Sequence, residues 1–251
     1  AGRAPSGGPS DMNSRLLRLA AVVTVGSFLP AALFPATTGG RAAASWQVDT
    51  GRSTFAVLTH KAGVAAKLAH DHLVIAHAPR TTLEFDPAKP QAAKLSVVVP
   101  VMSLEIDAPA ARKAHAERLR VLGALTDELG PIEEDDRAKI REAMLSPKQL
   151  FGERFGEVRA ELLALEPRGG GANARVALGW NAKVRIELRG AAIEKTFPAR
   201  FEVEGGELHA EVLGELRFTE FGIEPYSAAL GAVKNADLFH LWVDLVATPA
   251  K

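Results

Sequence analysis

Four histidines lie close together in the sequence and suggest metal chemistry. His70 and His72 flank Asp71, and His60 and His77 lie within ten residues of that pair. Residues two apart on a β-strand point to the same side, so His70 and His72 could reach one zinc or copper ion, with His60 from the preceding strand as a third ligand. The alternative is a strand edge whose histidines bond to backbone or water. We favour this alternative, because an H-x-H pair is a weak signal, and we predict no metal ligands and no cofactor.

No other group of residues suggests catalysis. The chain has no cysteine, which excludes a disulfide scaffold, a thiolate zinc site and a cysteine nucleophile. It contains no G-x-S-x-G, no H-E-x-x-H, no P-loop and no G-x-G-x-x-G opening a helix. The 30 basic and 30 acidic residues balance, which argues against a nucleic-acid partner. We therefore predict no catalytic residues and a protein that is not an enzyme.

The first 44 residues are typical of an export signal. Arg15 and Arg18 precede an apolar run from Leu19 to Ala36, which leads to three consecutive alanines ending at Ala44. Basic region, apolar region and small-residue cleavage site is the order of a secretory signal peptide. We expect cleavage there and a periplasmic or secreted domain of residues 45–251; an uncleaved membrane anchor is the alternative. Without residues 1–44, which carry four arginines and one aspartate, 26 basic and 29 acidic residues remain, a net charge of −3.

Period-two alternation predicts that most of the remaining chain forms strands. In 176–188 every even position is apolar, while charged residues accumulate at the odd positions, as expected for a strand with one buried face. Similar alternation recurs in 95–101, 197–203, 208–218 and 238–247. Short turns between such strands favour an antiparallel sheet, and about eight of them favour closure into a barrel.

The segment 107–150 interrupts the strands with two expected helices. The first has Asp107 as a plausible N-cap and Gly123 just after its end. The second begins near Pro131, with four acidic residues at 133–136 that complement the positive end of the helix dipole, and stops at Pro147.

Five short motifs occur in a recognisable order along residues 46–249. They are Trp46-Gln47-Val48-Asp49 with Ser53-Thr54-Phe55, Thr82 to Asp86, Val101 to Asp107, Val184 to Gly190 with Lys195 and Phe197, and Phe221-Gly222-Ile223 before the terminal strand. In this order they resemble the YceI-like family of polyisoprenoid-binding periplasmic proteins. The resemblance implies a lipocalin-like antiparallel barrel, no catalytic activity, and an apolar tunnel for an amphiphilic isoprenoid lipid of the polyprenyl phosphate or quinone type.

Alternation alone favours a filled barrel, so the hollow barrel rests on the resemblance. Three functions therefore stay open: an exported lipid carrier or reservoir, a metal-binding protein or metal-dependent enzyme centred on His70 and His72, and a solid envelope module whose 107–150 helices contact a partner. The lipid head group, transient membrane contact and a homodimer are also left open. For the carrier, the expected lipid-binding residues are Phe55, Val57, Val97, Val99, Val176, Leu178, Trp180, Val184, Ile186, Leu188, Phe201, Val212, Leu216 and Trp242.

Overall fold

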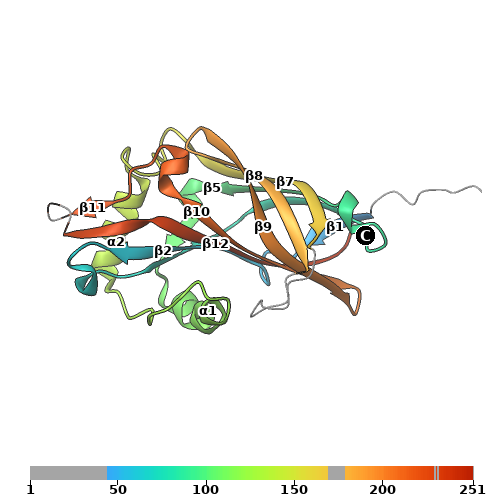
Figure 1. Ribbon diagram of the computed structural model, residues 1–251, viewed down its shortest axis with the longest axis horizontal. Helices are drawn as coiled ribbons and strands as arrows, with labels where there is room; N and C mark the ends of the chain where they lie inside the picture. The colour runs from blue at the N-terminus through green and yellow to red at the C-terminus, as the bar shows by residue number, and fades with distance from the viewer. Residues whose placement is uncertain (1–43, 169–178, 229, 231, 251) are drawn as a thin grey trace, which may run out of the picture. The chain divides into compact units, whose positions relative to one another are not determined.

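The computed structural model describes residues 44–168, 179–228, 230 and 232–250. The chain divides into two units, residues 1–40 and 41–251, and all described residues belong to the second. Its strands are β1 (Ala44–Val48), β2 (Thr54–Ala62), β3 (His72–Ala76), β4 (Arg80–Phe85), β5 (Lys94–Pro100), β6 (Leu104–Ile106), β7 (Glu157–Pro167), β8 (Trp180–Leu188), β9 (Ala191–Glu204), β10 (Glu207–Arg217), β11 (Ser227–Ala228) and β12 (Val233–Pro249). Two α-helices, α1 (Pro109–Val121) and α2 (Glu134–Leu145), lie between β6 and β7 (Figure 1). None of the described helices is long and apolar enough to cross a membrane.

The strands form one antiparallel sheet that closes into an eight-stranded barrel. Its order is β1-β4-β5-β7-β8-β9-β10-β12, and β12 returns to β1 through the pairs Trp46 with Pro249 and Val48 with Ala247. The long strand β12 also pairs through its earlier residues with β2, which continues the sheet into β3 and β6. The predicted lipocalin-like antiparallel barrel with two helices is therefore confirmed.

Tight turns set the register of the long strands. Arg189 and Gly190 join β8 to β9 with φ values of 51° and 77°, and Gly205 and Gly206 join β9 to β10 with 59° and 86°. Positive φ at both central residues defines the hairpin turn whose twist matches that of antiparallel strands. The Arg189 guanidinium also donates to the carbonyls of Gly222 (3.0 Å) and Pro147 (2.8 Å), which ties this turn to the loop after α2.

One half of the barrel interior is filled with large side chains. Trp46 packs edge-on against Phe85 with ring centroids 5.9 Å apart, and its Nε1 donates to the Phe85 carbonyl over 2.9 Å. Phe201 contacts both Phe85 and Trp180, at centroid distances of 5.3 and 5.0 Å. Leu245 completes this cluster, which occupies the half of the barrel where β1 pairs with β12.

Helix α1 packs on the outer face of β2, β3 and β12. Leu119 of α1 is fully buried against Leu58, Leu73 and Trp242. Beside it lies the Glu211 clamp, a carboxylate that is 2% exposed and accepts hydrogen bonds from Arg118 Nε (2.8 Å), Arg200 Nε (3.0 Å) and Trp242 Nε1 (3.1 Å). Burial opposes ionisation of Glu211, but these donors outweigh it and hold the pKa below its ordinary value. The clamp therefore joins α1 to β9, β10 and β12 through a charged group.

The helices begin and end nearly where the sequence predicts, with one correction. Gly123, with φ 81°, ends α1, and the N–H of the next residue, Ala124, reaches back to the Leu119 carbonyl over 2.9 Å. Helix α2 has acidic residues in its first turn and stops just before Pro147. The N-cap prediction for Asp107 was wrong: Ala108 holds that position without a side-chain cap. The Asp107 carboxylate is instead buried in a network described below.

Candidate ligand-binding cavity

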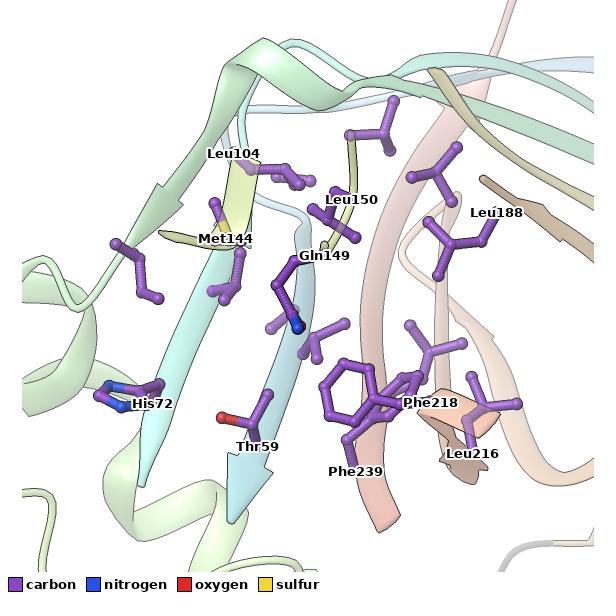
Figure 2. Close-up of a pocket in the computed structure, with 18 of the residues that line it drawn as sticks. Thr59, His72, Leu104, Met144, Gln149, Leu150, Leu188, Leu216, Phe218 and Phe239 are labelled. Carbon is purple, nitrogen blue, oxygen red and sulfur yellow. The ribbon is translucent and has the colours of Figure 1, made fainter. Parts of the chain in front are cut away.

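The other half of the barrel interior is hollow. A cavity of about 340 Å³ lies among the inner faces of β2, β3, β5, β6, β7, β8, β10 and β12, and residues of α2 also line it. Figure 2 shows part of this lining. That volume falls in the usual range for ligand pockets, about 300–1,000 Å³. Its apolar lining is Phe55, Ala56, Val57, Val74, Ala76, Val97, Val99, Leu104, Ile106, Ile140, Ala143, Met144, Leu150, Val158, Ala160, Ile186, Leu188, Leu216, Phe218, Phe221, Phe239, Leu241 and Val243.

The contrast between the two halves has a simple cause in side-chain size. The apolar side chains that β3, β5 and β7 contribute to the cavity wall are all short, such as Val74, Ala76, Val97 and Ala160. In the filled half, rings such as that of Phe201 reach across the interior to pack against one another. Alternation places apolar residues inward in both halves, and their volumes decide which half is filled.

Helix α2 closes one side of the cavity through an apolar stripe. Ile140, Ala143 and Met144 are spaced by three and four residues, so they share one face of the helix, and all three line the cavity. Figure 2 shows Met144 beside Leu104, with Gln149 and Leu150 extending the same wall. The helix is therefore amphipathic, and its apolar face forms a wall of the cavity.

Two polar side chains interrupt the apolar wall where β2 pairs with β3. Thr59 and His72 are register partners on these strands, and both line the cavity. The Thr59 side chain is buried, with the residue 7% exposed, and its hydroxyl has no hydrogen-bond partner among the described residues. A buried polar group without a partner is costly and uncommon in native proteins.

A buried ion pair holds the His72 ring. The His72 Nδ1 lies 2.7 Å from Asp107 Oδ2, and the same carboxylate accepts from the Leu73 backbone N–H over 2.9 Å and from Arg112 Nη1. Arg112, 4% exposed, also donates to the carbonyls of Asp71 and Gly130. Because a carboxylate only accepts, Nδ1 of the His72 ring is the donor in this contact.

The structure separates the histidines that sequence spacing had grouped. Thr59 is paired with His72 on the neighbouring strand, and both face the cavity. The adjacent His60 therefore lies on the outer face, where its Nε2 is 2.7 Å from His240 Nδ1. Burial, together with the positive charge of a protonated His60, lowers the pKa of His240. His70 precedes β3 instead of lying on it, and is exposed. Within the described part of the chain, no three His, Cys, Asp or Glu side chains are placed to hold a metal ion.

The predicted lipid-binding residues fall into four groups. Phe55, Val57, Val97, Val99, Ile186, Leu188 and Leu216 line the cavity. Trp180, Val184, Phe201 and Val212 do not line the cavity and pack against the buried Leu165, Ala182 and Ala199; Val184 and Val212 also pack against the cluster that contains Ile186 and Leu216. Trp242 lies on the outer face beneath α1, because it shares that side of β12 with His240 and not with Phe239, Leu241 and Val243. Val176 and Leu178 lie outside the described residues.

Sequence reasoning missed the polar pair and the α2 wall. Residues His72, Val74 and Ala76 form the inward face of β3, and their period-two alternation is the signal that indicates it. The stripe that begins at Ile140 was readable from its helical spacing. Nothing in the local sequence of Thr59 marks its hydroxyl as unpartnered, because that depends on the neighbouring strand.

Comparison with known proteins shows likeness of structure only. No family model matches the chain, and no curated protein matches it. Among solved structures, Burkholderia cenocepacia BcnA matches with a TM-score of 0.56 at 15% identity, over 80% of this chain and 100% of that one. A polyisoprenoid binding domain from Saccharophagus degradans matches at 0.44 and 9%, over 82% and 99%, and a Campylobacter jejuni YCEI protein at 0.42 and 10%, over 71% and 84%. At these identities the likeness shows the fold alone, and the match to BcnA, with a TM-score above 0.5, shows that this chain and that protein share a fold.

Proposed function

We propose that this protein is a non-enzymatic carrier or reservoir that holds one amphiphilic isoprenoid lipid in the hollow half of its barrel. The observation that carries the proposal is the cavity of about 340 Å³, whose walls are almost entirely apolar. Each methylene that a lipid tail buries there contributes about 0.8 kcal/mol. The isoprenoid class is supported by the resemblance of the sequence motifs to the YceI-like family.

The proposed site is the cavity lining, not the whole set of residues predicted from sequence. A tail in the cavity would contact Val57, Val97, Ile186 and Leu188, and α2 would cover it through Met144. Trp180 and Phe201 would stop the tail, since they fill the barrel beyond the cavity. The length of tail that the protein accepts is therefore set by the boundary between the two halves.

Titration of lipid-free protein with farnesol, a C15 isoprenoid alcohol, tests the proposal. In calorimetry we expect saturable binding of one molecule per chain, with a negative heat-capacity change because apolar surface is buried. The Val57→Phe variant should bind more weakly, because its ring occupies the cavity. The Val48→Phe variant, altered in the filled half, is the matched control and should keep the affinity. Absence of saturable binding to the folded wild-type protein would contradict the proposal.

We also propose that loading occurs at a membrane surface. The loops after β2 and before β12 are joined by a hydrogen bond from the Ala65 N–H to the Ala232 carbonyl, 2.9 Å long. Each loop carries an exposed apolar side chain: Val64 is 97% exposed and Leu230 fully exposed. Apolar tips of this kind suit shallow insertion between lipid head groups.

Export is proposed from the leader, residues 1–44. Strand β1 begins at Ala44, and its pairing with β4 and β12 involves residues 44–48, so cleavage between Ala44 and Ser45 would leave the strand almost whole. Sequencing the N-terminus of the protein recovered from its own cells checks this. A mature chain beginning near Ser45 supports export, and an intact apolar segment Leu19 to Ala36 in washed membranes contradicts it.

A further inference from the structure

The polar pair in the cavity indicates how the ligand is oriented. We propose that the Thr59 hydroxyl, with His72 beside it, is the binding site for an uncharged hydroxyl head group of the lipid. This inference rests on the proposed function and adds the chemistry of the head group to it. Figure 2 shows both side chains on one side of the cavity, with the Thr59 oxygen on the side facing His72.

The first argument is the unpartnered hydroxyl. Thr59 is 7% exposed, and its Oγ1 has no partner among the described residues, although it lies on the wall of a cavity. A hydroxyl both donates and accepts, so a ligand group placed beside it would satisfy it in either sense. Valine has nearly the same shape, and would fill the position without leaving a polar group unpaired if packing were the only requirement.

The second argument is that the buried Asp107 carboxylate fixes the orientation of the His72 ring. Asp107 has no exposed side-chain surface and fixes the ring through Nδ1, while Arg112 neutralises the carboxylate. A hydroxyl head group matches the Thr59 hydroxyl, because each can donate to and accept from the other, and the fixed His72 ring forms the wall beside it.

The charge around the cavity disfavours a phosphate head group. Of the lining residues that the structure describes, Lys139 is the one Lys or Arg, and its ammonium is 3.0 Å from Asp136 with the side chain 75% exposed. The buried Asp107 carboxylate beside His72 is paired with Arg112, so this ion pair offers no free cation to an anion. A phosphate would therefore lose its hydration without gaining a buried cation.

The strand register gives the direction of the tail. Thr59 pairs with His72, and two residues earlier in β2 the apolar Val57 pairs with Val74. Beyond them the wall continues to Phe55, which belongs to the core cluster of the filled half. The head group therefore sits at the polar pair, and the tail runs toward the filled half.

Three probes test the inference: farnesol, the hydrocarbon that lacks only its hydroxyl, and farnesyl phosphate. For wild-type protein we expect farnesol to bind about 3- to 10-fold more tightly than the hydrocarbon, the effect of one or two hydrogen bonds. Farnesyl phosphate should bind more weakly than farnesol. The Thr59→Val variant should lose the preference for farnesol over the hydrocarbon, and Thr59→Ser should retain it. Thr54→Val, on the opposite face of the same strand, is the matched control and should leave the preference unchanged.

The folding stability of the same variants separates a binding role from a structural one. Because the Thr59 hydroxyl has no partner in the part of the chain that the structure describes, Thr59→Val should leave the urea midpoint of lipid-free protein unchanged or raise it. A lower midpoint would show that the hydroxyl serves the fold, and would overturn the inference. Equal affinity of the wild type for farnesol and the hydrocarbon, or tighter binding of the phosphate, would overturn it as well while the carrier function stood. If none of the three probes bound, the carrier function itself would fail, and the inference with it.

Discussion

The same substitution, Val to Phe, should have opposite effects on stability in the two halves of the barrel. Val57 lines the cavity, whereas Val48 is 8% exposed within the filled cluster and does not line it. Apolar cavities of about 150 Å³ accommodate a benzene ring, so a cavity of about 340 Å³ has room for the added phenyl group.

The magnitudes follow from what each ring meets. Phe has about four more carbon atoms than Val, worth up to about 3 kcal/mol if all were newly buried. Because the ring touches the cavity wall on only some sides and loses rotamer freedom, we expect Val57→Phe to stabilise lipid-free protein by about 1–2 kcal/mol. Val48→Phe forces extra volume into a packed cluster and should destabilise the fold by about 1–3 kcal/mol.

Urea unfolding of lipid-free protein, followed by tryptophan fluorescence, measures both values. The reasoning requires opposite signs, with the Val57 variant unfolding at higher urea than the wild type. Loss of stability in both variants by similar amounts would refute it, because the interior around Val57 would then be as tightly packed as that around Val48.

Three further predictions concern the fold and the loop tips. Glu211→Gln should cost about 2–3 kcal/mol at neutral pH in urea unfolding, because it leaves the half-buried guanidinium groups of Arg118 and Arg200 without the buried carboxylate that they share. The pKa of Glu211 in the folded protein lies below its ordinary value. The stability that its charge contributes is therefore present above about pH 4.3 and is lost as the pH falls through the folded pKa. The stabilities of wild type and variant should converge in acid, and a difference that stays constant with pH would contradict this. Gly214→Ala should cost about 1–3 kcal/mol in the same assay, because a Cβ there would lie 2.3 Å from the ring of the buried Phe197, and an unchanged midpoint would show that the ring moves freely. The double variant Val64→Asp, Leu230→Asp should sediment less with anionic phospholipid vesicles while keeping farnesol affinity, and unchanged sedimentation would exclude these loops as the membrane contact.

Much of the barrel could be predicted from the alternation of apolar residues, because strand faces depend mainly on local pattern. Strands β8, β9, β10 and β12 occur where apolar residues alternate, and α2 begins where its acidic first turn indicates. The division into filled and hollow halves could not be predicted, since alternation gives the direction of a side chain and not the space left between opposite walls. Val57 and Val48 have the same chemistry in the sequence, yet only Val57 borders a cavity.

The site residues show the same limit. The spacing of His70 and His72 suggests a metal site, but the pairing of β2 with β3 places His72 on the inner face of the barrel wall and His60 on its outer face. Asp107 follows the rule for an N-cap in sequence, yet tertiary contacts with His72 and Arg112 take its carboxylate into the interior. In both cases a strand or helix distant in sequence determined the role of the residue.

Native mass spectrometry of protein purified from its own cells without detergent tests the central claim most directly. The account predicts a complex of the mature chain with one neutral isoprenoid lipid, identified after extraction as an alcohol or phenol, and reduced or absent in the Val57→Phe variant. The Val48→Phe variant should retain the lipid. Folded wild-type protein that carries no lipid, or carries it equally after the cavity is filled at Val57, would contradict the account.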